Sequence, residues 1–395
     1  MSALATENVL GRSQFAGGQS DVTYSREPGT KLVERRNDYE ANVASSFSDT
    51  LEVTAIDPLA DSAWDSVAVS HSESNVFHRT SWAKVICATY GHKPLYLEFR
   101  RGGKLVALLP MVEMASRLTG KRAVCMPFSD FCPPLVFDAQ RPEAIVEALL
   151  RKGRERKWRS FELRGGKNML PESVPAAEQY YRHRLNLAVG VEKLFAGLSS
   201  AARRAVRKAE KSAVTAEVGE NWDAMREFYR LHMRTRRKHG LPPQPLSFFR
   251  NIHREIIQKG LGFVVLARVA TRPIAGAVFF HSGRSALYKF GASDKSASKL
   301  RGSNLVMWQG IQELAKRGSV TLDFGRTDLH QSGLRDFKLS WGATEEIADY
   351  FKFSVQTNKW LTGGNQKSKL HEGIFRRLPL VVNRLAGRLI YPHLD

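Results

Sequence analysis

Cysteine and long apolar runs are both scarce in this sequence. Its three cysteines, Cys87, Cys125 and Cys132, are too few and too scattered for a disulfide framework or a zinc site, and their apolar neighbours predict buried thiols. No run approaches the ~20 apolar residues of a membrane span, and the N-terminus lacks the basic and apolar regions of a signal peptide. We therefore expect a cytoplasmic protein without a bound metal, with a peripheral position at the inner membrane as an alternative.

Acidic residues are the second scarce class. The sequence has 39 Asp and Glu against 60 Lys and Arg, so its formal net charge at pH 7 is +21. This excess favours polyanionic partners: nucleic acid, nucleotide- or diphosphate-linked substrates, or an anionic membrane surface. The aromatic residues lie in apolar runs and do not alternate with the basic patches, which argues against a module that binds single-stranded nucleic acid.

Large apolar residues are also rare in residues 1–50, which we interpret as a disordered segment. From residue 51 onward the chain passes twice through one pattern: a hairpin strand, a helix, and a strand that ends in glycine. The first pass uses residues 104–112, 142–157 and 160–165, and the second uses 273–281, 303–317 and 320–325. This internal duplication predicts an α/β (α+β) protein with two related domains, residues 51–188 and 189–355.

Residues 356–395 form a basic tail. In its second part, apolar residues recur at roughly helical spacing, with Arg376, Arg377, Arg384 and Arg388 between them. Pro379 is expected to kink this helix or to start it afresh. A basic amphipathic helix can lie on an anionic membrane surface, whereas the alternative is a C-terminal helix that packs on the domain.

Cations dominate residues 199–214, where five lysines and arginines accompany one glutamate. Among them, Arg204 is three positions from Arg207 and four from Lys208, so the three side chains project from adjacent sides of one helix. Their repulsion is relieved when a phosphate, a diphosphate or a nucleic-acid backbone neutralises them. The segment is therefore a candidate anion-binding site, and the alternative is a solvated surface helix.

A second candidate anion site precedes the helix expected from Ser303. The sequence before this helix is rich in Gly, Ser and Lys, and it includes Lys299, Arg301 and Gly302. Free backbone N–H groups at a helix N-terminus can hold a phosphate. Lys299, Arg301, Gly302 and Ser303 are therefore candidate ligands of a phosphate-bearing donor.

Residues 321–345 carry the densest group of polar side chains. The segment opens as a buried strand, which we expect to break at Gly325. Asp323 within this strand is expected to pair with Arg326. A loop is then predicted to present Arg326, Asp328, His330, Arg335, Asp336 and Lys338. Loops on a rigid scaffold often carry function, although a charged surface loop with Arg–Asp pairs is the alternative.

Three motifs, ARRAVRKAEKSAV, YKFGAS…GSNLVMWQGI and LDFGRTD…GLRDFKLSWGA, together with the tandem halves, resemble one known family. It is the Fem-like, peptidoglycan-bridge branch of the GNAT acyltransferase superfamily, and especially its FemAB-related members associated with exosortase/PEP-CTERM and exopolysaccharide systems. The resemblance implies two tandem GNAT-like domains with mixed sheets flanked by helices. It also implies transfer of an acyl or aminoacyl group to an amine of a cell-envelope or exopolysaccharide precursor.

The resemblance also implies roles for single residues. Phe337 and Lys338 match a motif whose lysine is essential in Fem ligases, and Arg335 and Asp336 are their neighbours. Lys338 would stabilise the oxyanion of the tetrahedral intermediate or hold a donor phosphate. Proton acceptors for the attacking amine are Asp336, Asp328, His330 or a phosphate of the substrate. The candidate substrate contacts come from residues 321–345 and from the basic motif: Arg326, Asp328, Arg335, Arg204, Arg207 and Lys208.

The donor stays open between acetyl-CoA or another acyl-CoA and aminoacyl-tRNA. About 10 residues separate Lys211 from Trp222, which leaves no room for the coiled-coil arm of tRNA-binding Fem ligases. The stretch from Lys299 to Asn304 has one glycine where acetyl-CoA-binding GNAT proteins usually have two. Two other functions are alternatives: acetyl-CoA-dependent N-acetylation of an amino sugar, and a non-catalytic, membrane-associated scaffold of polysaccharide assembly.

Overall fold

The computed structural model describes residues 50–61, 63–116, 120–363 and 372–393. The predicted disorder of residues 1–50 therefore concerns a segment outside the described residues, apart from its last residue. Within the described residues, no helix combines the length and the apolar character needed to cross a membrane. Cys125 and Cys132 are buried, as expected, whereas Cys87 is half-buried.

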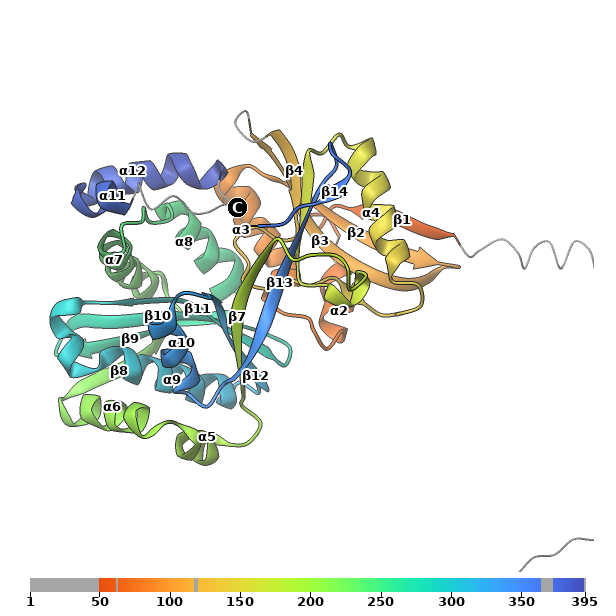
Figure 1. Cartoon of the computed structure of the whole chain (residues 1–395). Helices are drawn as coiled ribbons and strands as arrows, with labels where there is room; N and C mark the ends of the chain where they lie inside the picture. Colours follow the sequence, from red (N-terminus) through yellow and green to blue (C-terminus); the bar gives the residue numbers. More distant parts are fainter. Residues whose placement is uncertain (1–49, 62, 117–119, 364–371, 394–395) are drawn as a thin grey trace, which may run out of the picture. The chain divides into compact units, whose positions relative to one another are not determined.

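A mixed sheet organises the described residues (Figure 1). Its strand order is β1-β2-β3-β4-β6-β13-β7-β12-β11-β10-β9-β8, with β5 paired to β3 and β14 paired to β13. The strands are β1 (Leu51–Ile56), β2 (Lys93–Arg101), β3 (Lys104–Ser116), β4 (Gly120–Val124), β5 (Leu135–Val136), β6 (Ser160–Arg164), β7 (Glu178–Asn186), β8 (Val214–Gly219), β9 (Gly262–Val269), β10 (Arg272–Ser282), β11 (Ser285–Ser293), β12 (Thr321–Asp328), β13 (Thr344–Ser354) and β14 (Lys359–Trp360).

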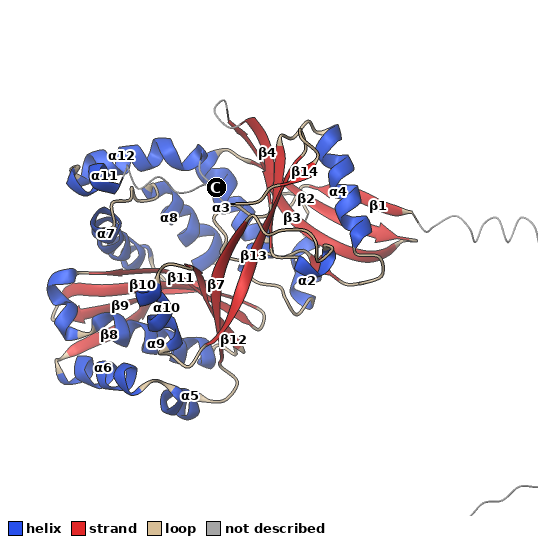
Figure 2. Cartoon of the chain, viewed as in Figure 1, coloured by secondary structure: helices blue, strands red, loops and turns tan. Residues whose placement is uncertain are grey.

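Helices cover both faces of this sheet (Figure 2). They are α2 (Trp64–Ser70), α3 (Thr80–Tyr90), α4 (Glu143–Glu155), α5 (Val191–Gly197), α6 (Ser200–Lys211), α7 (Trp222–Lys238), α8 (Leu246–Ile252), α9 (Gly302–Lys316), α10 (Ser332–Leu339), α11 (Glu372–Arg377) and α12 (Leu380–Ile390). The predicted mixed α/β fold with flanking helices is therefore confirmed. Between α6 and α7 the chain forms β8, and no coiled-coil arm is present in this fully described stretch.

The two sequence halves exchange their last strands. β13 follows β12 in the second half, yet it pairs antiparallel with β6 of the first half, for example Phe353 with Phe161. β7 follows β6 in the first half, yet it pairs antiparallel with β12, for example Leu322 with Leu185. β7 and β13 also pair with each other in the middle of the sheet (Figure 1). The boundary predicted between residues 188 and 189 stays a prediction, and the sheet is continuous across it.

Two apolar cores stabilise the fold. The larger joins the first half to α7 and α8, where Trp82 of α3 contacts Phe248 and Phe280 at ring-centroid distances of 5.9 Å each. The smaller lies between α5, α6 and α9 and the opposite face of β9 to β12, and includes Trp308 and Trp341. Because the larger core contains residues of both halves, the described parts of the two halves pack as one unit.

One close approach holds α9 on the sheet. A Cβ built on Gly310 would overlap the ring of Phe279, which is fully buried and stacks on Phe263 with 5.4 Å between ring centroids. We expect Gly310→Ala to lower the free energy of unfolding by about 1–3 kcal/mol, because an added methyl group strains a packed core. Urea unfolding measures this. Gly333→Ala in α10 is the matched control, because its Cβ meets no atom within 4 Å. Equal unfolding midpoints for the two variants would contradict the prediction.

The structure corrects three local expectations in the second half. β12 does not break at Gly325 but continues to Asp328 through a register shift between Asp323 and Arg326. The segment expected to be a loop contains the helix α10, which begins at Ser332. Asp323 pairs with Arg182 of β7 and not with Arg326, because β7 brings a strand of the first half against it.

Candidate active site

The site lies where two parallel strands separate. β11 and β12 are paired over only three residues each, from Ser285 with Thr321 to Leu287 with Asp323, although both strands continue further. Gly325 has a φ of +71°, in the left-handed region that favours glycine. The Asp323 carboxylate accepts a 2.7 Å hydrogen bond from the Gly325 N–H and stabilises this irregularity. The local bulge therefore turns the Gly325 and Arg326 carbonyls out of the ladder.

Lys338 occupies the space beside this bulge. It is the buried residue of α10, 2% exposed, and its Nζ donates to the Gly325 carbonyl at 2.7 Å and to the Arg326 carbonyl at 3.1 Å. Burial lowers the pKa of the Lys338 ammonium to about 8, against the opposing influence of Asp130 and other nearby carboxylates. An ammonium has three N–H donors, so one donor is left for a ligand after these two carbonyls.

A second carboxylate beside Gly325 comes from the first half. Asp130 lies in the segment between β4 and β5, and its Oδ2 accepts a 2.6 Å hydrogen bond from the Lys289 Nζ of β11. A Cβ on Gly325 would lie 3.3 Å from the Asp130 carboxyl carbon, so the two residues are neighbours. Burial raises the pKa of Asp130, but Lys289 and Arg326 lower it more, and the net pKa is below its ordinary value. Asp130 is therefore a half-buried carboxylate that stays ionised.

Arg326 adds a third cation, which is half-buried. Its guanidinium lies 4.7 Å from the Tyr180 ring centroid and 5.4 Å from that of Tyr350, and it donates to the Tyr350 hydroxyl at 3.2 Å. The Tyr350 hydroxyl in turn donates to the Asp130 carbonyl at 2.5 Å. Lys289 and Arg326 thus lie beside the Asp130 carboxylate, which also acts on Lys338, and cations held in fixed positions can stabilise a bound anion or a developing oxyanion.

The remaining predicted residues of this segment have different surroundings. Arg335 forms a two-pronged ion pair with Glu345 at 2.6 and 2.7 Å, which points to a structural role. Phe337 is half-buried with its ring 5.9 Å from that of Trp341. Asp336 and His330 are exposed, while Asp328 is half-buried and close enough to raise the pKa of the lysine. The structure therefore brings Lys338, Arg326 and Asp328 together and leaves Asp336 and His330 in solvent.

Both predicted anion sites are present as surface features. Arg204, Arg207 and Lys208 are exposed on α6, and Arg207 lies 5.6 Å from the ring centroid of Phe195. They are on a regular helix, as predicted. No contact joins them to Lys338 in the described part of the chain.

The N-terminus of α9 fits a phosphate-bearing donor. Lys299, Arg301 and Ser303 are exposed around it. Gly302 is buried, and a Cβ atom at this position would lie 2.9 Å from the Ile274 side chain. Arg301 has a φ of +59° and ends the preceding 3-10 helix, so that α9 starts sharply. The first N–H groups of a helix lack partners within it, and here cationic side chains flank them. This arrangement could hold the phosphates of an acyl-CoA.

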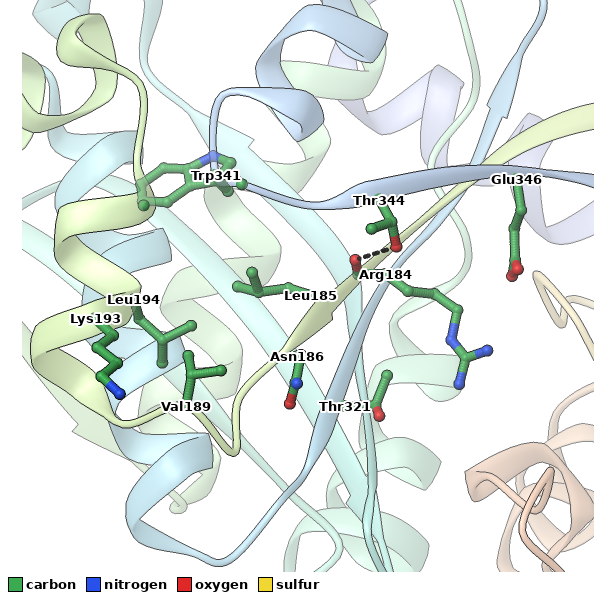
Figure 3. Close-up of a pocket in the computed structure, with 12 residues that line it drawn as sticks. Arg184, Leu185, Asn186, Val189, Lys193, Leu194, Thr321, Trp341, Thr344 and Glu346 are labelled. Atoms are coloured by element: carbon green, nitrogen blue, oxygen red, sulfur yellow. Dashed lines mark hydrogen bonds between the residues drawn. The ribbon is translucent and has the colours of Figure 1, made fainter. Parts of the chain in front are cut away.

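A separate cavity of about 390 Å³ opens beside the start of β12 (Figure 3). None of the predicted site residues lines it. Its walls combine cations, neutral polar groups and an apolar side, and its lining includes Arg184, Lys193, Asn186, Thr344, Leu194 and Trp341. In Figure 3, Lys193 and Leu194 of α5 stand opposite Leu185 and Asn186 of β7.

Sequence reasoning missed Asp130, Lys289 and His183. A lysine inside the apolar strand of β11 was a signal that could have identified Lys289. Asp130 carries no such signal, because its partners are far away in sequence. His183 is fully buried, its Nε2 lies 2.9 Å from Glu345 Oε2, and its Nδ1 has no partner among the described residues. Burial and the nearby Lys338 lower its pKa, so this imidazole is neutral near pH 7.

Comparisons with known proteins agree with this geometry. Residues 198–339 match the family described as an acetyltransferase (GNAT) domain. The crystal structure of FemX is similar, with a TM-score of 0.60 and 15% identity over 76% of this chain and 96% of that chain. A tandem GNAT protein from the clavulanic acid biosynthesis pathway has a TM-score of 0.50 and 10% identity, and covers 78% of this chain and 99% of that chain. None of the curated proteins compared with this chain matches it.

The family match contains α6, α9, β12 and α10, and therefore the elements that carry Lys338 and the N-terminus of α9. The similarity to FemX and to the tandem GNAT protein extends over both halves. Residues 198–339 therefore match a GNAT acetyltransferase domain, and the fold is shared with FemX and with a tandem GNAT protein, which supports the Fem-like GNAT branch that the motifs resemble.

Proposed function

We propose that this protein transfers an acyl or aminoacyl group to an amine of a cell-envelope or exopolysaccharide precursor. The observation that carries the proposal is the buried Lys338 ammonium, held on the Gly325 and Arg326 carbonyls where β11 and β12 separate, with one N–H donor to spare. The similarity of the fold to FemX supports a Fem-type transfer.

The proposed chemistry is aminolysis of an activated carbonyl. The amine attacks the carbonyl carbon of a thioester or ester, a C–N bond forms, and the oxygen becomes an oxyanion. Lys338 donates its remaining N–H to this oxyanion, and Arg326 adds positive charge nearby. The amine loses a proton, which we assign to Asp328, because this carboxylate is half-buried near Lys338. The C–S or C–O bond then breaks, and the leaving group takes up a proton.

Donor and acceptor would be held by different parts of the molecule. We assign the donor phosphates to Lys299, Arg301, Ser303 and the first N–H groups of α9, and anionic groups of the acceptor to the exposed cations of α6. When bound, an acyl-CoA would supply a thioester, which is an activated acyl group. Acetyl-CoA-dependent N-acetylation of an amino sugar is the second candidate, favoured by the match to an acetyltransferase domain.

A thermal shift assay with the full chain tests these assignments. We expect CoA or acetyl-CoA, or tRNA if the donor is aminoacyl-tRNA, to raise the melting temperature, because a ligand at 100 times its Kd stabilises the folded state by about 2.7 kcal/mol. UDP-linked amino sugars probe the acceptor side. For a CoA donor, Lys299→Gln with Arg301→Gln should reduce the CoA shift, whereas Lys316→Gln, an exposed change at the other end of α9, should leave it unchanged.

The negative outcome is equally specific. If neither CoA compounds nor tRNA shift the melting temperature, and no acyl group reaches an amino sugar or a peptidoglycan precursor, the transfer proposal is wrong. The non-catalytic scaffold would then be the better description.

A further inference from the structure

The C-terminal helix α12 packs on the protein with an unusual face. Its buried residues are Asn383 and Gly387, which are polar or small. Asn383 donates to the Phe375 carbonyl at 2.7 Å and so ties α12 to α11. A Cβ on Gly387 would overlap the carbonyl oxygen of Pro243, so the glycine allows the helix to lie directly on the backbone beside α7. The buried contact of α12 with the rest of the protein is therefore made by Asn383 and Gly387, and not by its large apolar side chains.

The tail is held firmly beyond this contact. Tyr391 is buried, and its hydroxyl accepts a 2.8 Å hydrogen bond from Arg236 of α7 and donates to the Pro242 carbonyl at 3.2 Å. The ring of Tyr391 lies 6.0 Å from that of Phe128 in the first half. The orientation of α12 is thus determined by contacts on both sides of Gly387. Its outward face is a defined surface of the folded chain.

This outward face is apolar. Val381, Val382, Leu385 and Leu389 are 63%, 42%, 54% and 72% exposed. At about 100° per residue, these four positions span an arc of roughly 100° on one side of the helix. A normal packed helix turns such a stripe toward the core, but here the stripe is exposed, although α12 packs on α7 (Figure 1). We name it the apolar stripe.

Cations border the apolar stripe. Arg384 and Arg388 are exposed and lie on its flank, within roughly 60° of Val381 around the helix. Residues 373–393 contain four arginines and no acidic residue. The neighbouring helix α7 adds exposed Arg234 and Lys238. An apolar stripe with a cationic border is complementary to a bilayer surface that offers acyl chains beneath anionic headgroups.

From these observations we propose that α12 docks this protein on an anionic lipid surface through its apolar stripe. A second copy of the chain is a poorer occupant, because two such stripes would bring their arginine borders together. The arginine border also discriminates against a neutral bilayer. The inference is independent of the proposed transferase activity, since none of its residues belongs to the Lys338 cluster. It would place that cluster near substrates carried by a membrane lipid.

Co-sedimentation of the full chain with lipid vesicles tests this inference. We expect vesicles of equal parts phosphatidylcholine and phosphatidylglycerol to bind the protein at least tenfold more strongly than phosphatidylcholine alone, with weaker binding at high salt. Leu385→Gln with Leu389→Gln should lower the partition coefficient about tenfold, because apolar area is lost from the contact. Arg384→Gln and Arg388→Gln should each lower the partition coefficient about fivefold, and only on the anionic vesicles.

The control is Leu59→Gln with Ile347→Gln, which changes two apolar residues of similar exposure, 44% and 48%, outside α12. Its vesicle binding should equal that of the unchanged protein. All variants should melt at the same temperature, because the altered side chains are exposed. The inference is overturned if anionic vesicles do not bind the protein, or if the Leu385 and Leu389 changes leave binding intact. It is also overturned if sedimentation velocity shows a dimer that these changes dissociate while vesicles fail to bind.

Discussion

Lys338→Met is expected to lower the rate of acyl transfer by about 10²–10³-fold, the usual effect of removing one oxyanion donor. The methionine keeps the length and the apolar stem of the side chain but has no donor for the Gly325 and Arg326 carbonyls or for an oxyanion. A steady-state assay with the donor and acceptor found by thermal shift measures the loss. Lys316→Met, an exposed change in α9, should keep the full rate.

The pH profile separates a cationic role of Lys338 from a role as a base. Because its pKa is about 8, the ammonium is present below that pH. If the cation stabilises the transition state, the rate falls as the pH rises through about 8, and Lys338→Met lacks this decline. A rate that instead rises through the same pH would mean that the neutral amine acts as a base, and the assignment would then be wrong.

The same pKa affects stability in a defined direction. The folded-state pKa of about 8 is below the ordinary value of 10.5, so the unfolded state binds the proton more tightly between these values. The contribution of Lys338 to stability therefore increases as the pH rises from about 8 to about 10.5. Urea unfolding at pH 7 and at pH 10 should show the difference between the unchanged protein and Lys338→Met shifting in favour of the unchanged protein. This check also shows whether the variant is folded in the activity assay.

Asp130→Ala is expected to lower the free energy of unfolding by about 3–5 kcal/mol, because it leaves a buried cation without its partner. The Lys289 side chain is 7% exposed, and its ammonium lies 5.0 Å from the ring centroid of Phe77 and 5.4 Å from that of Phe290. Among the residues that the structure describes, removal of the carboxylate leaves the Lys289 ammonium only the Phe128 carbonyl as a hydrogen-bond acceptor, at 2.7 Å. Urea unfolding at pH 7 measures this cost.

A surface ion pair is the matched control. Glu217 is 64% exposed and pairs with Arg268. We expect Glu217→Ala to lower the free energy of unfolding by at most about 1 kcal/mol. Replacing both partners of the buried pair, with Asp130→Leu and Lys289→Met, should recover much of the lost stability. If Asp130→Ala lowers the free energy of unfolding no more than Glu217→Ala does, the Asp130–Lys289 pair does not stabilise the junction of the two halves.

The Asp130 effect should also depend on pH. The pKa of its carboxyl is held below its ordinary value, with the Lys289 and Arg326 cations outweighing burial. Its stabilising contribution is therefore complete above the ordinary pKa of an aspartate and is lost as the pH falls through the lower, folded-state pKa. The stability difference between the unchanged protein and Asp130→Ala should shrink in acid. If this stability difference stays constant with pH, burial alone, and not charge, determines how much stability Asp130→Ala loses.

Local patterns in the sequence were sufficient for most of the secondary structure. Gly102 and Gly103, with φ of +52° and +76°, form the tight turn between β2 and β3 that a Gly-Gly pair predicts. Pro379 separates α11 from α12, because proline cannot continue a helix. The motifs that resemble the Fem-like GNAT branch also implied the mixed sheet with flanking helices. In each case the signal is a property of neighbouring residues, which one short stretch of sequence contains.

Tertiary structure decided the site and the surface of the tail. The exchange of β7 and β13 brings Arg182 against Asp323, and residues more than a hundred positions apart form the Asp130–Lys289 pair. No local signal encodes such contacts, because they depend on how whole elements pair. The sequence showed that the tail is amphipathic, but only packing against Pro243 turned its small and polar side inward. Likewise the sequence identified Lys338 by its motif, whereas burial beside the bulge at Gly325 lowered its pKa and left its amine one donor for chemistry.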